Sequence, residues 1–343
     1  MAYISFQPKD NFSTLLWTGN GSAGRAITGV GFQPDMVWIK NRSTTDNHAI
    51  FDATRGATYR IYPNDTDAQI QATNSLASFD SDGFTLNDGG DANGNGENIV
   101  GWNWKANGAG SANTDGSTNT TSTSANTTAG ISIMKYGGTG SSATIGHGLS
   151  ATPKVLLFKQ LDGTESWRMW HRDAPNYSTK ALALNLDSAE FSQSNWVGTV
   201  NNSTIALGAD GSINLNAKNY ICYAFAEKTG FSKFGTYIGN GSTWGTFVNC
   251  GFKPAWILVK CTTHSEYWHL YDGTRNPSNE ANLRVLPNVN NAESTEAGVD
   301  LLSNGFKWRN SASNFNGSGK TYIYMAFAEE PLVASNGTPA TAR

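Results

Sequence analysis

A nine-residue phrase near the C-terminus constrains the fold of this chain most, because it occurs twice more upstream. Residues 321–329 read TYIYMAFAE and residues 219–227 read NYICYAFAE, while residues 98–105 carry the more diverged NIVGWNWK. Each copy closes a block of roughly 100 residues. A phrase that returns at such a period is typical of a chain built from repeated structural units. We therefore expect the sequence to encode mainly a repeated architecture rather than one catalytic cluster.

Other phrases recur between the first and third blocks at one fixed separation. GFQP, MVWIK and FDATR in the first block correspond to GFKP, WILVK and YDGTR in the third. The separation is 220 positions for Pro34 and Pro254, for Lys40 and Lys260, and for Asp52 and Asp272. The middle block is more diverged but keeps YGGTG at 136–140 and VLLFK at 155–159. Three units are the simplest interpretation.

The closing phrases alternate with the period-two pattern of a β-strand. One row is large and apolar in every copy, which predicts a face in the core: Val100, Trp102 and Trp104; Ile221, Tyr223 and Phe225; Ile323, Met325 and Phe327. The opposite row is smaller in most copies: Gly101 and Asn103, Cys222 and Ala224, Tyr324 and Ala326. We expect another layer or another subunit to lie against that second row.

The composition favours an all-β protein with many tight turns. Charged residues make up 15% of the chain, glycine occurs 37 times, and Asn-Gly and Asp-Gly pairs recur throughout. We predict three tandem β-sandwich repeats of jelly-roll type at 1–106, 131–230 and 231–333. Residues 107–130, rich in Gly, Ser, Thr and Asn, are predicted to be an extended linker that could lie against another surface, and 334–343 a frayed tail. The short connection after residue 227 predicts close packing of blocks two and three.

Charge and targeting signals exclude several classes of partner. The net charge of −3 favours neither nucleic acid nor an anionic membrane. No apolar run reaches the length of a membrane span, and the N-terminus lacks the pattern of a secretory signal. Three cysteines without CxxC spacing indicate buried thiols in a reducing cytoplasm rather than disulfides.

A partial calcium-loop pattern lies at 91–97, DANGNGE. Asp91, Asn93 and Asn95 match the first ligand positions of such a loop, where alternate oxygens converge on one cation. The position that should supply a closing glutamate is Trp102. We therefore favour a glycine-rich turn and predict no metal and no cofactor, with these three residues as a weak calcium candidate.

Five of the eleven tryptophans lie in polar, turn-rich surroundings: Trp167, Trp170, Trp196, Trp244 and Trp268. Exposed rings beside polar groups are a common way to bind sugars. Aromatic rings are also enriched in subunit interfaces. Both interpretations stay open for these five residues.

Motifs of known catalytic sites are missing from the sequence, so we predict no enzymatic activity. The Asp-x-Thr-Arg phrases at 52–55 and 272–275 could pair an acid with a guanidinium in a sugar site, but their repetition favours an aspartate that caps its own turn. His48 aligns with Trp167 and Trp268, which argues against a metal ligand. Paired carboxylates of a glycosidase cannot be recognised from sequence, because their separation is spatial.

Several long phrases resemble a family of uncharacterised domains found in tailed bacteriophages and prophages. They include GFQPDMVWIKNR, VGWNWKANG, ISIMKYGGTGSSATIGHGL, YAFAEKTGFSKFGTYIGNGS and YIYMAFAEEP, and they cover nearly the whole chain. Members of this family are commonly labelled tail, tail-fibre or virion structural proteins. The opening SFQPKDNF resembles the usual start of such proteins, so no large preceding anchoring domain is expected.

The resemblance implies a virion component made in the host cytoplasm, and it transfers no ligand or catalytic residue. We expect a tail or tail-fibre protein with an adhesive or assembly role, whose partners are other virion proteins and a host-surface glycan. A homo-oligomer is expected, with a trimer as the first choice. The alternatives are a polysaccharide-degrading tailspike enzyme and a capsid fibre or decoration protein.

Overall fold

The all-β prediction is confirmed by the structure, a computed structural model that describes residues 6–330, the side chain of residue 297 excepted. Strands account for 41% and helices for 3% of the residues. The helices within this range are η1 (Pro8–Asp10), α1 (Gly90–Asn93) and α2 (Gly211–Asn214), and none could cross a membrane. The tail predicted at 334–343 lies outside the described residues.

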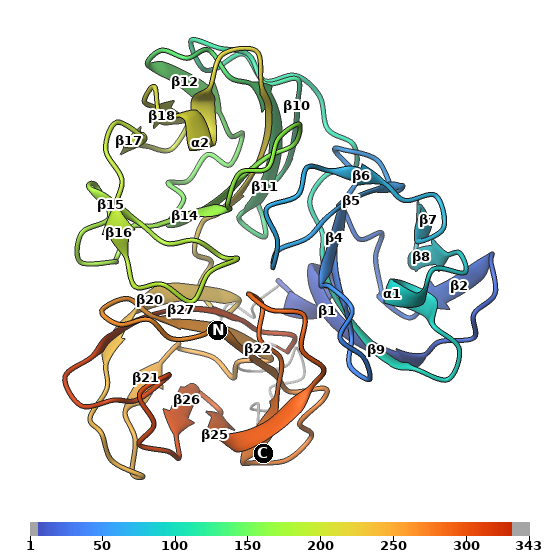
Figure 1. The fold of residues 1–343 in the computed structure, drawn as a ribbon, viewed down its shortest axis with the longest axis vertical. Coiled ribbons are helices and arrows are strands. Elements are labelled where there is room, and N and C mark those ends of the chain that lie inside the picture. Colours follow the sequence, from blue (N-terminus) through green and yellow to red (C-terminus); the bar gives the residue numbers. More distant parts are fainter. Residues whose placement is uncertain (1–5, 331–343) are drawn as a thin grey trace.

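The strands form three lobes around a common centre (Figure 1). We call them unit 1 (residues 6–106), unit 2 (107–227) and unit 3 (228–330), and each has an inner and an outer sheet. In unit 1 the inner order is β1 (Phe12–Thr18), β9 (Asn98–Trp104), β3 (Met36–Asn41), β4 (Ala49–Asp52), β5 (Tyr59–Ile61), β6 (Ile70–Gln71), and the outer order is β2 (Arg25–Thr28), β8 (Gly83–Leu86), β7 (Leu76–Asp80).

Units 2 and 3 follow the same plan. In unit 2 the inner order is β10 (Ser122–Asn126), β11 (Ile131–Gly137), β19 (Asn219–Phe225), β13 (Val155–Gln160), β14 (Arg168–His171), the outer order is β12 (Ala143–Gly146), β18 (Thr204–Leu207), β17 (Val197–Val200), and β15 (Lys180–Ala181) pairs with β16 (Phe191–Ser192). In unit 3 the inner order is β20 (Ser232–Ile238), β27 (Thr321–Phe327), β22 (Trp256–Cys261), β23 (His269–Asp272), and the outer order is β21 (Phe247–Asn249), β26 (Gly305–Trp308), β25 (Ser294–Leu302), β24 (Ala281–Arg284).

The strand registers match from unit to unit, which defines equivalent positions. The closing strand β9 lies between β1 and β3, β19 between β11 and β13, and β27 between β20 and β22, each antiparallel to both neighbours. The equivalent pairs at the centre of the sheets are Trp102 with Trp38, Tyr223 with Leu157, and Met325 with Leu258. Residues that share such a position can therefore be compared directly across the three units.

The large apolar rows of the closing strands meet at the centre of the molecule. Val100, Trp102, Ile221, Met325 and Phe327 belong to one buried cluster that draws side chains from all three units. The predicted core face is thus buried, and its core is shared between units instead of lying inside one sandwich. All three units pack on one another, whereas the sequence had indicated close packing only for blocks two and three.

The opposite rows lie against the outer sheets, so each unit also has a core of its own. Cys222 and Ala224 belong to the cluster inside unit 2, and Tyr324 and Ala326 to the cluster inside unit 3. In unit 1 a Cβ on Gly101 would lie 2.9 Å from the Trp17 ring. A small residue there allows the aromatic layer of the unit to close on the sheet.

Residues 107–130, predicted to be an extended linker, are part of unit 2. Strand β10 forms the edge of its inner sheet, and Thr120 and Ser124 are buried. Ser117 and Thr144 exchange two hydrogen bonds, each backbone N–H donating to the other hydroxyl at 2.8 and 2.9 Å. The segment therefore covers the free edge of β12, and its hydroxyls and backbone supply the bonds that its few apolar groups cannot.

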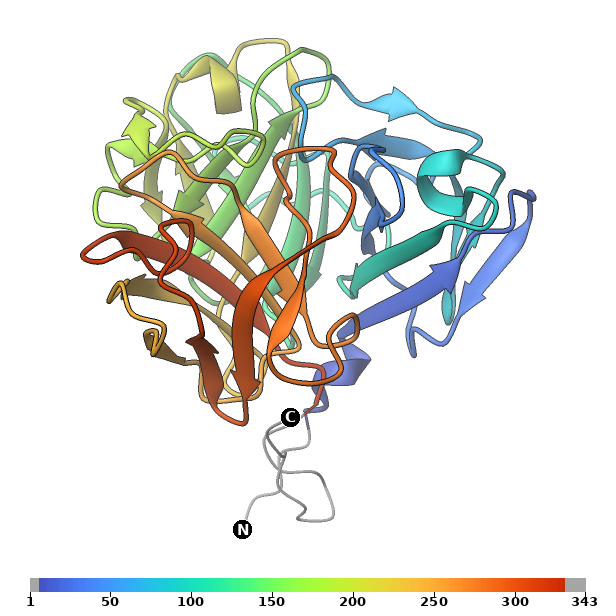
Figure 2. The same ribbon diagram turned by 60° about the horizontal axis from the view of Figure 1, so that its bottom comes forward.

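The first and last parts of the described chain close the ring of units. The backbone N–H of Thr14 donates to the Glu329 carboxylate at 2.7 Å, just as that of Phe234 donates to Glu227 at 2.9 Å. Figure 2 shows β1 and the end of β27 at the same end of the molecule. Unit 3 therefore meets unit 1 through the same kind of bond by which unit 2 meets unit 3.

Candidate functional site

The Asp-x-Thr-Arg phrases lie at contacts between units and form buried ion pairs. Asp52 pairs with Arg55 and Asp272 pairs with Arg275, with all four side chains fully buried. Each aspartate also caps its own turn, since Asp272 accepts the backbone N–H of Arg275 at 2.8 Å. The turn-capping interpretation thus agrees with the geometry, and the four buried side chains are not exposed to a sugar.

A neighbouring unit completes each ion pair. Tyr223 of unit 2 donates its hydroxyl to Asp52 at 2.6 Å, and Trp102 of unit 1 donates its ring N–H to Asp272 at 3.0 Å. The third interface differs: its donor position is Met325, which cannot donate, and the Asp and Arg positions are His171 and Ala174. Where the donor is missing, the buried ion pair is missing as well, which indicates a structural role for the phrase.

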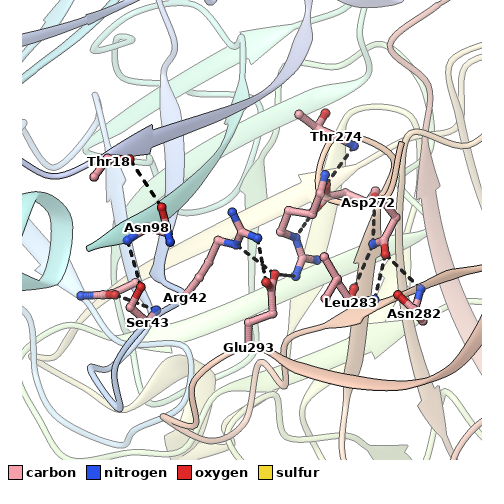
Figure 3. A network of polar contacts seen from close by, with 12 residues as sticks. Thr18, Arg42, Ser43, Asn98, Asp272, Thr274, Asn282, Leu283 and Glu293 are labelled. Carbon is pink, nitrogen blue, oxygen red and sulfur yellow. Dashed lines mark hydrogen bonds and ion pairs between the residues drawn. The ribbon is translucent and has the colours of Figure 1, made fainter. Parts of the chain in front are cut away.

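Glu293 adds a second ionic link between units 3 and 1. Its carboxylate accepts two hydrogen bonds from the Arg42 guanidinium, at 2.7 and 2.9 Å, and one from Arg275 at 2.9 Å (Figure 3). Burial alone would lower the pKa of Arg275, but Asp272 and Glu293 raise it above its usual value. The guanidinium therefore stays charged in the interior.

The His48 position also contacts the next unit around the ring. In each unit the ring at this position donates an N–H to a backbone carbonyl of a neighbouring loop: His48 to Leu286 at 3.2 Å, Trp167 to Tyr62 at 2.8 Å, and Trp268 to Ala183 at 3.0 Å. For the histidine this tautomer is fixed because Nδ1 accepts the Trp38 ring N–H at 3.1 Å. The exchange of His for Trp preserves one donor, which explains the alignment without a metal.

The recurring lysine near the end of each central strand bonds the same neighbouring loop as the ring of the His48 position. Its acceptor lies four residues after the carbonyl that accepts the ring N–H. Lys40 donates to Asn290 at 3.2 Å, Lys159 to Thr66 at 3.0 Å and Lys260 to Asp187 at 3.1 Å, always at the backbone carbonyl. Burial lowers the pKa of each lysine to about 8. These cations hold the units together and are too enclosed to meet a ligand.

Buried histidines should make the fold sensitive to acid. Burial lowers the pKa of His48, His147, His171 and His269, for His171 to about 4. Below about pH 6.5 the unfolded chain takes up protons that the folded chain excludes. The stability that the neutral histidines contribute is therefore complete above about pH 6.5 and is lost as the pH falls from 6.5 to 4, by about 3 kcal/mol for His171 alone. Urea unfolding at pH 7.5, 5.5 and 4.5 would measure the loss; His171→Gln should reduce it, and exposed His264→Gln should not.

Four of the five candidate tryptophans are buried, which corrects the prediction of an exposed sugar-binding set. Trp167, Trp170, Trp196 and Trp268 are at most 2% exposed. Trp167 and Trp268 fill interfaces between units, and Trp170 and Trp196 belong to the core of unit 2. Only Trp244, 68% exposed, keeps the predicted surface position, and the other ten tryptophans are all buried.

Trp244 lies in an aromatic and cationic surface on unit 3, the Trp244 patch (Ile238, Trp244, Phe247, Lys307 and Arg309). The Lys307 ammonium lies 4.1 Å and the Arg309 guanidinium 4.9 Å from the centre of the Trp244 ring. Ile238 is 63% and Phe247 43% exposed, and Phe247 faces Lys307 across strands β21 and β26. Arg309 also pairs with the Asp300 carboxylate at 3.3 Å. The exposed indole with Lys307 at its face can stack a sugar ring and pair with an anion.

Local structure explains how the Trp244 patch is presented. The loop before β21 is fixed by the Asn240 amide, which donates to the Trp244 carbonyl at 2.9 Å, and by the Gly245 N–H, which donates to the Trp308 carbonyl at 3.0 Å. Along residues 306–309 the inward rings of Phe306 and Trp308 alternate with Lys307 and Arg309. This alternation of inward rings and basic residues is the sequence signal for the two surface cations, which were not among the residues predicted from sequence.

The Trp244 patch breaks the threefold pattern. By strand register the position of Lys307 is Thr85 in unit 1 and Ala206 in unit 2, and the position of Phe247 is Ala26 and Thr144. The fold therefore forms twice without these side chains. Large apolar groups exposed on one unit only are more readily explained by binding than by stability.

The weak calcium candidate is not assembled. The Asp91 carboxylate is paired with Arg60 and accepts the Ser75 hydroxyl at 2.8 Å. The Asn93 amide is buried and bonds Asn20, Ser22 and Asn87 around the preceding turn, while Asn95 is exposed. Within residues 6–330 no three His, Cys, Asp or Glu side chains form a group that could hold a metal ion.

The family model described as a domain of unknown function, DUF7483, matches residues 7–331. No curated protein and no solved structure matches the chain significantly.

Proposed function

The chain belongs to the DUF7483 family, and we propose that it is a structural protein of a bacteriophage particle, in the tail or tail fibre, that adheres to the host surface. In this proposal the Trp244 patch binds an acidic polysaccharide and no bond is made or broken. The observation that carries the adhesive role is Trp244 itself, the one exposed tryptophan of eleven, in contact with Lys307 and Arg309. The resemblance of its long phrases to phage tail proteins supports the virion placement.

The architecture supports a mechanical role for the chain. Three units share one buried core and are joined by hydrogen bonds at each interface, including the closing bond from Thr14 to Glu329. A closed ring of this kind resists relative motion of its units, because any opening exposes part of the common core. The homotrimer expected from the sequence remains a separate prediction, since the threefold arrangement described above lies within one chain.

The Trp244 patch should account for binding to host cells. Trp244→Ala is expected to weaken binding to a carboxylated host polysaccharide roughly 30-fold, the loss typical of an anchor residue worth about 2 kcal/mol. Whole-cell adsorption and a glycan array with carboxylated and neutral polysaccharides would measure it. Tyr267→Ala, which removes another exposed ring of unit 3, is the matched control and should bind normally. If the intact protein bound neither cells nor polysaccharide, only the structural role would stand.

The rival function is degradation of the same polymer by a tailspike enzyme. It is tested by incubating the purified protein with host envelope polysaccharide and assaying new reducing ends. Release of sugar ends would overturn the proposal that the chain has no catalysis. An unchanged polymer that still binds the protein would support adhesion alone. Images of labelled particles would separate a tail position from a capsid fibre or decoration.

A further inference from the structure

The outer sheet of unit 2 has a hollow at the place where unit 3 carries the Trp244 patch. Thr144 and Ala206 face each other across β12 and β18, as Phe247 and Lys307 do across β21 and β26. A cavity of about 460 Å³ opens there, within the ~300–1,000 Å³ range of small-molecule sites. One position on the fold thus carries a projecting patch in one unit and a depression in another.

The lining presents hydroxyl and amide groups, above the Trp196 ring, which is 2% exposed. It includes Trp196, Asn195, Ser142, Ser178 and Thr144, and Ser117 of the segment that covers the edge of β12. Ser117 and Thr144 accept each other's backbone N–H, so each hydroxyl keeps its own proton to donate to a ligand. Such a set of short polar groups suits the hydroxyls of a sugar.

Small residues keep the hollow open. A Cβ on Gly198 would lie only 3.2 Å from the Ala206 Cβ. The two small residues are therefore in contact, and neither has a long side chain that could fill the hollow. Gly208 lies against the backbone of Asn195, where a Cβ would come within 2.0 Å of the carbonyl oxygen. Asn195 itself has a φ of 54°, in the left-handed region that Asn adopts more readily than most residues. This tight turn leads into Trp196, whose ring is buried in the core of unit 2.

The lining has no charged side chain, in contrast to the Trp244 patch. A carboxylated sugar would therefore lose hydration here without gaining a cation. We propose that this cavity, the unit 2 pocket, binds a neutral hexose residue of a polysaccharide. The chain then has two carbohydrate sites at equivalent places of its fold, one neutral in unit 2 and one acidic in unit 3. The neutral site rests on its own geometry and does not require the Trp244 patch to bind.

Saturation-transfer NMR on the full chain tests the unit 2 pocket directly. The probes are methyl α-D-glucopyranoside, methyl β-D-galactopyranoside and N-acetyl-D-glucosamine, with D-glucuronate as the acidic comparison. We expect transfer to at least one neutral sugar, and no transfer to D-glucuronate in the Trp244→Ala variant, which lacks the acidic site. Ala206→Phe places a ring over the hollow from the outward face of β18 and should abolish the transfer. Ser142→Phe fills the same space from the residue before β12 and should do so too.

Two controls separate this site from folding defects and from the Trp244 patch. Thr85→Phe makes the corresponding change in unit 1 and should leave the transfer intact. Trp244→Ala should also leave it intact, even where binding of acidic polysaccharide is lost. Melting temperatures of the variants would show that they fold. The proposal is overturned if no neutral sugar receives transfer, or if folded Ala206→Phe and Ser142→Phe bind as the intact protein does.

Discussion

Replacing Phe327 with alanine is expected to lower the free energy of unfolding by about 3–5 kcal/mol, because it leaves a cavity in the shared core. Phe327 is 1% exposed in the core shared by the three units. Its ring packs against rings of every unit, at 5.6 to 5.9 Å between centroids: Phe12, Trp104, Phe225, Phe231, Phe234 and Trp256. The cavity would open where no single unit can collapse to fill it.

Phe247→Ala is the matched control, because it removes the same side chain from a surface position that is 43% exposed. Both variants would be unfolded in urea. Their transition midpoints would be compared, provided that the free energy of unfolding falls with urea concentration at the same slope in both. The control should change stability by less than about 0.5 kcal/mol. A loss for Phe327→Ala as small as that of the control would mean that the three units do not share a core.

Period-two alternation was enough to predict which face of the closing strand is buried. It could not show against what that face packs, since a row such as Ile323, Met325 and Phe327 reads the same whether its partner is the second sheet of one sandwich or two other units. The closed ring follows from contacts between residues far apart in sequence, such as Thr14 with Glu329. No local pattern carries that information.

The candidate tryptophans were misjudged because their sequence neighbours are polar. Trp167 follows Glu165 and Ser166, which favoured an exposed loop. Its ring instead crosses to unit 1 and donates to the Tyr62 carbonyl. Trp244 stands in similar surroundings but on an outer loop of unit 3, where no other unit covers it. Exposure at these positions depends on where the neighbouring unit lies.

Residues 107–130 were misjudged for a related reason. A segment with few apolar side chains cannot form a core, so its composition predicted a linker. It can still complete an existing sheet through its backbone, as β10 does beside β11. Composition measures what a segment can bury, and says little about the hydrogen bonds it can make to a neighbouring edge strand.

Breaking the buried ion pair of unit 3 should destabilise the chain almost as much as opening the core. Asp272→Ala is expected to cost about 3–5 kcal/mol, because it leaves the Arg275 charge buried and removes the acceptor of the Trp102 ring N–H. Glu293 stays within 2.9 Å of Arg275 and limits the loss. Equilibrium unfolding in urea would measure the change.

The third interface suggests how the same loss can be relieved. Unit 2 has His171 and Ala174 where unit 3 has Asp272 and Arg275, so this fold tolerates the position without any ion pair. The double variant Asp272→Ala/Arg275→Ala also removes the unpaired cation. Its loss of stability should therefore be smaller than the sum of the losses of the two single variants. The difference should be about 1 kcal/mol or more, on the order of coupling energies between contacting residues. Additive losses would mean that the two side chains stabilise the interface independently and that the charge pair is not its essential feature. Non-additivity would identify the Asp-x-Thr-Arg phrase as a unit kept for contact between neighbours, which is why it occurs only where the facing strand supplies a donor.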